Sequence, residues 1–343
     1  MERENRTYRY YYRHQPSFFW PITLITVGIT WLLVNNGTIP AENVYRLFPL
    51  WPVLLILAGI SLLLRRVWWP LSGLVWAAAA AFFVWALINP PAFLPEATMP
   101  EVRHETYNEA LGSTQSASVT MDLSGWPNRV YALENSSDLF LADVNYIGGF
   151  HVGVSGSDQK KDVRFDENRD TRYWTVGFVR ALEDQNRPWE IGLSPRIPLR
   201  LNIDTNSGPS TLNLEGLRLE SLRLEGGSGN IEINLPEESP RFLFDYRGGS
   251  GALTVNVPDG SDFELRMDTG SGNVVIDLPD GAAVRVDVRN GGSGALKFAA
   301  GFTKVEDRGD DDEGIWENEA YTDAGSGIDI VVSDQGSGDI EIR

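Results

Sequence analysis

The hydrophobic pattern divides the chain into two parts. Three long apolar runs at 18–34, 47–64 and 67–88 contain no charged residue, and each can cross ~30 Å of hydrocarbon as a helix. Beyond them apolar and polar residues alternate in short runs between Gly, Asn, Asp and Pro, which is the period of half-buried strands. The pattern predicts a membrane protein with an all-β domain: three transmembrane helices in a region at 17–88, followed by strands.

An internal repeat supports the membrane assignment. The pattern WPxxLIxxGIxxLL begins at Trp20 and again at Trp51, and Trp69–Pro70 opens the third run in the same way. Trp favours the headgroup interface, and Pro fits the first helical turn, where its missing N–H has no intrahelical partner. These residues therefore indicate helix packing and anchoring and not a ligand site.

The arginine distribution predicts the topology. The tail at 1–16 carries four Arg, the first loop carries Arg46, the second turn carries Arg65 and Arg66, and the exit from the third run carries none. Since short cytoplasmic loops are enriched in Lys and Arg, we expect a multi-pass protein of the cell membrane with a cytoplasmic tail and an extracytoplasmic C-terminal domain. The spans contain no ionisable residue, which argues against a transporter or pump.

The β domain contains a repeat of roughly 21 to 22 residues. A Ser that follows Gly or Asn and precedes Gly recurs at Ser207, Ser228, Ser250, Ser271, Ser293, Ser326 and Ser337. An alternating strand follows the turn, as in 231–235, and a second turn with Leu-Pro or Val-Pro leads to another strand, as in 242–246. Each repeat is thus two strands and two turns.

Units this small bury their apolar faces only by stacking. We predict a flattened parallel β-solenoid, and not an antiparallel meander, because one repeat places Gly-Ser-Gly over Gly-Ser-Gly. Glycine permits a positive φ at such corners. The expected organisation is a linker at 89–116, an irregular β module at 117–195 that covers the first coil, and the solenoid repeat domain at 196–343. The stretch 302–322 breaks the period as an inserted loop or hairpin.

Charge separates the two parts as well. Residues 1–100 carry seven Arg and four Glu, and with a net charge of −18 for the chain this leaves 21 excess negative charges in 101–343. An acidic domain disfavours nucleic acid and favours cations or basic peptides, although an acidic face kept merely for solubility is the simpler explanation of the charge. Asp310–Glu313 could bind a cation weakly or form a solvated loop.

No catalytic, cofactor-binding or metal-binding residue can be assigned. The chain has no Cys and three scattered His, and it lacks GxSxG and the Gly-Lys-Ser/Thr of a P-loop. The run 226–234 is similar to a calcium-binding nonapeptide, but Ile231 stands where the liganding Asp is needed. We therefore expect a protein without a cofactor that is not an enzyme.

Both parts of the chain resemble known families. The twofold WPxxLIxxGIxxLL unit resembles the LiaI/LiaF-like transmembrane region of bacterial cell-envelope stress proteins. WEIGLSPRIPLRLNIDTNSG at 189–208 and the GSGNIEINLP-type repeats resemble the toastrack β-domains, also called adhesin domains, that accompany it. The resemblance implies a bacterial membrane protein concerned with envelope stress sensing, regulation of a partner kinase, or scaffolding. It supplies no catalytic residue.

Three functional hypotheses remain open. The first is a non-enzymatic envelope protein whose solenoid binds, senses or regulates; its partners would be membrane lipid, a membrane protein or sensor kinase, cationic peptides or cell-wall components. The second is a surface adhesin or scaffold that self-associates through an open solenoid end at Asp339–Arg343. The third, a carbohydrate-active enzyme, is disfavoured because outward residues such as Glu232, Asp245 and Arg285 form no cluster.

Overall fold

The structure is a computed structural model of the chain. It describes residues 19–47, 50, 52–53, 55–57, 59–60, 69–91, 102–123, 125–147, 149–168, 187–237, 239–309, 312–321 and 327–343. The chain forms two compact units. One, residues 1–100 with 171–185, holds the helices, and the other, residues 101–170 and 186–343, holds the strands.

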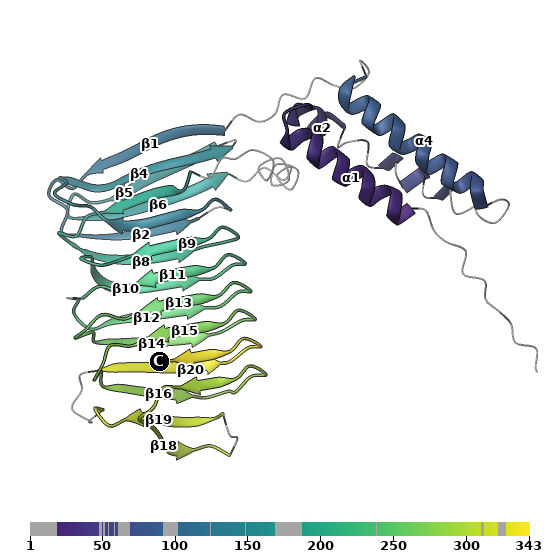
Figure 1. The fold of residues 1–343 in the computed structure, drawn as a ribbon. Helices are drawn as coiled ribbons and strands as arrows, with labels where there is room; N and C mark the ends of the chain where they lie inside the picture. The colour runs from purple at the N-terminus through teal and green to yellow at the C-terminus, as the bar shows by residue number, and fades with distance from the viewer. Residues whose placement is uncertain are drawn as a thin grey trace, which may run out of the picture. The chain divides into compact units, whose positions relative to one another are not determined.

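The helical unit contains α1 (Phe19–Asn35), α2 (Ala41–Leu47) and α4 (Trp69–Ile88) (Figure 1). Val44 and Leu47 of α2 are buried with Leu87 of α4, and the Asn43 amide donates a hydrogen bond of 2.7 Å to the Leu87 carbonyl. Helices α1 and α4 lie in the predicted spans 18–34 and 67–88, whereas much of 47–64 and the whole tail 1–16 lie outside the described residues. Among the residues described, no helix combines the length and the hydrophobicity needed to cross a membrane.

The β unit consists of two mixed sheets (Figure 1). In the described residues, the ten-stranded sheet has the order β1 (Val102–Ala110), β4 (Asp138–Ile147), β7 (Trp189–Leu193), β3 (Asn128–Ala132), β9 (Ser210–Asn213), β11 (Ile231–Asn234), β13 (Leu253–Asn256), β15 (Val274–Asp277), β21 (Ile340–Ile342) and β17 (Leu296–Phe298). The eleven-stranded sheet has the order β18 (Phe302–Asp307), β19 (Gly314–Asn318), β16 (Val284–Val288), β20 (Ile328–Asp334), β14 (Phe263–Asp268), β12 (Phe242–Arg247), β10 (Arg218–Glu225), β8 (Pro198–Asp204), β2 (Ser116–Asp122), β6 (Lys160–Asn168) and β5 (Gly149–Gly156).

Strands β8 to β15 form the regular part of the stack. Each coil contributes one strand to each sheet, and equivalent strands of successive coils pair in parallel. Ile231 pairs with Leu253 and Leu253 with Val274, so the register advances by one sequence repeat per coil. The predicted parallel stacking is confirmed for these coils, and the antiparallel meander is excluded.

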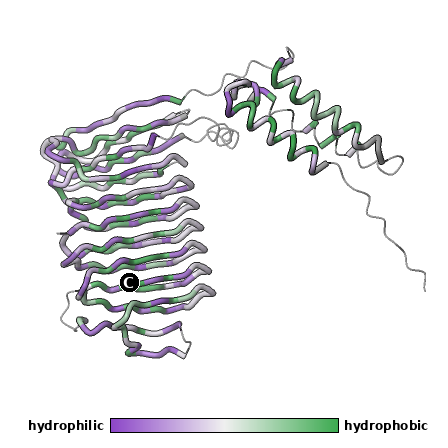
Figure 2. Tube along the Cα trace, in the orientation of Figure 1, coloured by the Kyte–Doolittle hydropathy of each residue, from purple (hydrophilic) through white to green (hydrophobic). Residues whose placement is uncertain are grey.

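A single apolar core lies between the two sheets. Along the strands of the regular coils buried residues alternate with more exposed ones, as in the buried Ile231 and Ile233 around the exposed Glu232. Figure 2 shows the same alternation of apolar and polar positions along the stacked strands. Because a fully buried Val, Leu, Ile or Phe contributes roughly 1.5–3 kcal/mol, the stacked rows of such residues account for most of the driving force for folding.

The Gly-Ser-Gly corners stack through direct backbone contact. The N–H of Ser271 donates to the Gly249 carbonyl at 2.9 Å, and a Cβ added to Gly272 would collide with the carbonyl of Gly251. Close approach is therefore what requires glycine at these corners. The positive φ expected there occurs instead in the opposite turns, at Gly260 (φ 72°) and Gly281 (φ 77°).

The predicted linker at 89–116 is wrong over part of its length. Strand β1 lies inside it and pairs antiparallel with β4 at one edge of the ten-stranded sheet. Most of its residues are exposed, so β1 lacks the apolar alternation by which the other strands were found. The module at 117–195 also contributes directly to the stack, since β2 and β3 pair in parallel with β8 and β9.

The C-terminal strands depart from sequence order. Strands β20 and β21 lie between β14/β15 on one side and β16/β17 on the other. The segment 302–322 contains the antiparallel hairpin of β18 and β19, which pairs with β16, so the predicted inserted hairpin is confirmed. The open solenoid end predicted at Asp339–Arg343 is wrong, because β21 has a neighbour on each side. Strands of any two coils can pair in the same register, as Ile328 does with both Phe263 and Val284. The repeat spacing therefore does not determine which coils become neighbours in the stack.

Candidate functional site

The stacking gives the eleven-stranded sheet a continuous outward face. Parallel pairing places outward side chains of successive coils in straight columns. One such column runs through Asn202, Arg223, Asp245, Arg266, Val331 and Asp287. Acidic and basic residues alternate along part of this column, so neighbouring coils present opposite charges to one another.

Ion pairs connect many of these outward residues. Arg200 lies 2.8 Å from Glu220, Arg266 lies 2.7 Å from Glu264, and Arg223 lies 3.4 Å from Glu225. Exposed pairs of this kind contribute about 0–1 kcal/mol each. Their consequence here is electrostatic, because they give one face of an acidic domain a mixed charge.

A shallow polar groove lies on this face where β2, β8 and β10 end. It has a volume of about 390 Å³ and is lined by Thr120, Met121, Asp122, Asn202, Ile203, Asp204, Arg223 and Glu225. The Asn206 amide fixes its edge by donating to the Asp122 carboxylate and, at 2.7 Å, to the Leu123 carbonyl. The groove offers both charge signs within a short distance, which suits a polar chain segment with paired donors and acceptors.

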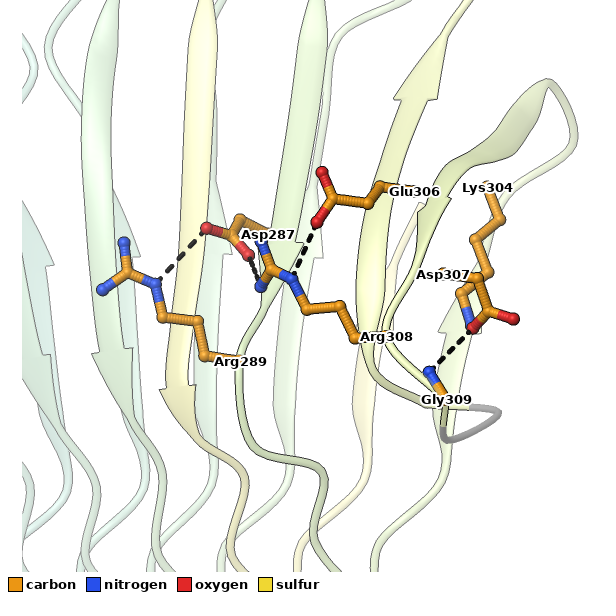
Figure 3. Close-up of polar contacts among 7 residues, drawn as sticks. All are labelled: Asp287, Arg289, Lys304, Glu306, Asp307, Arg308 and Gly309. Carbon is orange, nitrogen blue, oxygen red and sulfur yellow. Dashed lines mark hydrogen bonds and ion pairs between the residues drawn. The ribbon is translucent and has the colours of Figure 1, made fainter.

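A compact charge network lies at the hairpin end of the same sheet (Figure 3). Arg308 donates to Asp287 at 2.6 Å and to Glu306 at 3.1 Å, and Arg289 donates to Asp287 at 3.3 Å. The hydrogen bond from Lys304 lowers the pKa of the Asp307 carboxyl. The hydrogen bond to Asp287 raises the pKa of the Arg308 guanidinium. The network joins β16 to β18 and neutralises its own carboxylates.

The predicted weak cation site at Asp310–Glu313 receives no structural support. Asp310 and Asp311 lie outside the described residues, and the Glu313 carboxylate accepts a hydrogen bond of 3.2 Å from the Gly291 N–H. No group of three or more His, Cys, Asp or Glu side chains with metal-site geometry occurs in the part of the chain that the structure describes. Cation binding at this loop stays a prediction.

One polar anchor was missed by the sequence analysis. Arg241 donates to the carboxylates of Asp262 and Asp329 and, at 3.0 Å, to the Gly327 carbonyl. Asp329 is 88 residues away in sequence. Only the stacking order brings these groups together, and no pattern in the sequence reveals that order.

Comparisons with known proteins agree with this architecture. Residues 102–256 match the family model of the N-terminal domain of toast_rack, DUF2154, and residues 18–63 match the LiaI-LiaF-like transmembrane region. No curated protein matches the chain. Among solved structures the chain is similar to that of a proposed cell adhesion protein from Clostridium sporogenes, with 14% identity, a TM-score of 0.44, and coverage of 71% of this chain and 99% of that one. The two family matches confirm the resemblance found in the sequence, that of a membrane protein with a LiaI-LiaF-like transmembrane region followed by a toast-rack β-domain.

Proposed function

We propose that this protein is a non-enzymatic, membrane-anchored component of the bacterial cell envelope, and that its solenoid binds a membrane partner such as a sensor kinase. The observation that carries the proposal is the outward face of the eleven-stranded sheet, on which acidic and basic residues alternate along a column that leads into a polar groove. Electrostatic complementarity of this kind sets partner choice and association rate more than affinity. It suits a reversible sensing or regulatory contact.

The finer topology belongs to the same proposal. Three spans at 18–34, 47–64 and 67–88 would place the tail in the cytoplasm and the β unit outside, as the Arg asymmetry indicates. A reporter active only in the cytoplasm is expected to be silent when fused after Arg343 and active when fused before Met1. An active reporter after Arg343 would contradict the three-span arrangement.

The charge network supports a binding role over catalysis. Catalytic groups need a pKa matched to proton transfer. Lys304 instead lowers the pKa of Asp307, and Arg308 compensates both Asp287 and Glu306. The Asp307 carboxyl consequently stays ionised near neutral pH, in keeping with a surface that recognises charge.

Site-specific photo-cross-linking in intact cells tests the binding proposal. A photoreactive residue replaces Arg247 on the eleven-stranded face, and a matched control replaces Glu232 on the outer face of the ten-stranded sheet; both positions are exposed. The proposal predicts a discrete protein adduct from position 247 and a much weaker one from position 232. Equal adducts from both faces, or none from either in correctly localised protein, would contradict a partner surface on the eleven-stranded sheet.

Self-association is the second candidate. The contact first assigned to it, an open end at Asp339–Arg343, is excluded because β21 pairs with β15 and β17. The enclosed position of these residues between two coils nevertheless offers a different way for two copies to join.

A further inference from the structure

The last coil of the chain is an insert between two earlier coils. This terminal coil, residues 327–343, contains β20 and β21 joined by the corner that includes Ser337. At that corner the N–H of Ser337 donates to Gly270 at 3.0 Å, and the N–H of Ser293 donates to Gly336 at 3.1 Å. The terminal coil is thus hydrogen-bonded on one side to the corner between β14 and β15 and on the other side to the corner between β16 and β17.

Apolar burial holds the terminal coil in this slot. Ile328, Ile330, Val332, Ile340 and Ile342 are each at most 1% exposed. They complete the apolar rows between the neighbouring coils. Ile328, for example, pairs with Phe263 on one side and with Val284 on the other. A segment of 17 residues therefore contributes a complete layer of the core.

Polar contacts fix the coil to both walls of the slot. On the β14/β15 side, the Asp329 carboxylate accepts a hydrogen bond from Arg241, and Arg343 donates a hydrogen bond to Asp277. On the β16/β17 side, Lys297 donates to Asp339 at 2.9 Å. The buried Gln335 amide donates to the Gly294 carbonyl at 3.0 Å. All of these bonds join the terminal coil to segments distant in sequence, and none depends on both partners belonging to one chain.

We propose that the terminal coil is exchanged between two copies of this protein, each inserting residues 327–343 between β14/β15 and β16/β17 of the other. Reciprocal insertion makes a closed two-fold dimer that reproduces every contact of the single chain, so the exchanged and unexchanged forms have similar interface energy. Anchoring in one membrane raises the local concentration of the second copy and favours the exchanged form. The inference uses the proposed membrane anchor but not the proposed partner.

Disulfide capture in the membrane tests the exchange. Two full-length chains with different affinity tags are co-expressed, one carrying Arg266→Cys and the other Val331→Cys, in a protein that has no cysteine of its own. Residues 266 and 331 are register partners on β14 and β20. Neighbouring strands lie ~4.8 Å apart, within disulfide reach. The proposal predicts a disulfide-linked heterodimer that reduction dissolves.

Two controls make every result decisive. The double variant R266C/V331C on one chain checks that the pair can close a bond, and its failure to do so would overturn the proposal by contradicting the pairing itself. Arg223→Cys with Val331→Cys reports lateral packing of two outer faces, because Arg223 lies two strands beyond Arg266 in the same column. Exchange predicts at least about tenfold more heterodimer from 266/331 than from 223/331, since residues 223 and 331 lie three strand spacings apart, beyond disulfide reach.

Equal yields from the 266/331 and 223/331 pairs would overturn exchange in favour of lateral association. Absence of heterodimer, with the double variant fully bonded within its own chain, would show that the terminal coil stays in its own chain. Neither result bears on the adduct expected from position 247, so failure here and failure of the proposed partner surface can be told apart.

Discussion

The regular coils β8 to β15 and the terminal coil β20–β21 share one design but occupy the stack in different ways. Each consists of a strand, a corner with Ser-Gly and a second strand with alternating burial. The regular coils are stacked in sequence order, whereas the terminal coil lies between the β14/β15 coil and the β16/β17 coil, both of which precede it in sequence. A repeat therefore specifies how two coils pair and leaves open which two coils become neighbours.

The ends of the stack favour the observed order. The hairpin β18–β19 pairs with the outer edge of β16, and this edge is the place where the terminal coil would lie if the order were sequential. An exposed edge strand carries unpaired N–H and C=O groups and tends to pair with other chains. With the hairpin on the outer edge of β16, the terminal coil has its place on the inner edge.

The largest expected effect is a difference in how the two regions unfold after loss of a core side chain. Ile233 of β11 and Ile330 of β20 are both buried, and replacing either by Ala removes core contacts worth roughly 2–5 kcal/mol. We expect Ile233→Ala to lower the stability of the whole β unit. Ile330→Ala should release the terminal coil first, because that coil is inserted between coils that are distant from it in sequence. Hydrogen exchange of the full-length protein in detergent checks this, and equal loss of protection in both regions for both variants would contradict a separable terminal coil.

Glycine substitutions probe the corners of the two regions. Added Cβ atoms at Gly251 and Gly338 would collide with the carbonyls of Gly229 and Gly272. We expect Gly251→Val and Gly338→Val to destabilise their coils by about 1–3 kcal/mol through backbone strain. The exposed Ser250 is the matched control, and Ser250→Ala should have little effect on thermal unfolding. Similar melting temperatures for the Gly and Ser variants would contradict stacking by close backbone contact.

Alkaline pH should lower the folding stability of the regular coils. Burial raises the pKa of Tyr246 in β12 to about 12, because the charged phenolate is poorly solvated in the core. The stability that this neutral phenol contributes is complete below its ordinary pKa of 10.0 and is lost as the pH rises through about 12. Tyr246→Phe should remove one late-titrating phenol from an absorbance titration and flatten the stability loss above pH ~10. A Tyr246 that titrates like an exposed tyrosine would contradict its burial.

Acid should weaken the docking of the terminal coil, and this is the smallest of the expected effects. The N–H of Ala295, and then the Lys297 ammonium, lower the pKa of Asp339 below its ordinary value of 3.8. Because the folded-state pKa is depressed, this contribution is complete above pH 3.8 and declines as the pH falls through the folded-state value. Amide protection in β21 should be lower in Asp339→Asn than in the unaltered chain at neutral pH, and this difference should shrink as the pH falls below 3.8. Identical acid profiles would show that Asp339 does not help to dock this coil.

Much of the fold could be predicted from particular residues. Six of the seven Ser-centred turns and the alternation around Ile233 or Phe244 predicted parallel coils with the correct period, whereas Ser326 lies outside the described residues. The hairpin that was one of the two expectations for 302–322 is confirmed, and it extends the eleven-stranded sheet beside β16. Strand β1 was missed because its sequence, VRHETYNEA, is largely exposed and lacks an apolar face. The stacking order was missed because Phe263, Ile328 and Val284 share one register.

The candidate surface was predictable only in outline. The acidic charge of 101–343 indicated an electrostatic surface, but not that Arg308 would compensate Asp287 and Glu306. The bridge from Arg241 to Asp329 depends on the terminal coil's place in the stack. Contacts between residues tens of positions apart follow from stacking order, a property that local sequence patterns do not encode.

Three double-cysteine variants of the full-length chain test the inserted position of the terminal coil most directly. Val275, Glu341 and Lys297 form one outward column, with Glu341 paired to both of the others. The account predicts disulfides in V275C/E341C and in E341C/K297C. It predicts none in V275C/K297C, whose residues lie two strand spacings, ~9.6 Å, apart and beyond disulfide reach. Efficient bonding of V275C/K297C, with loss of the E341C/V275C bond, would show that the coils stack in sequence order and contradict the account.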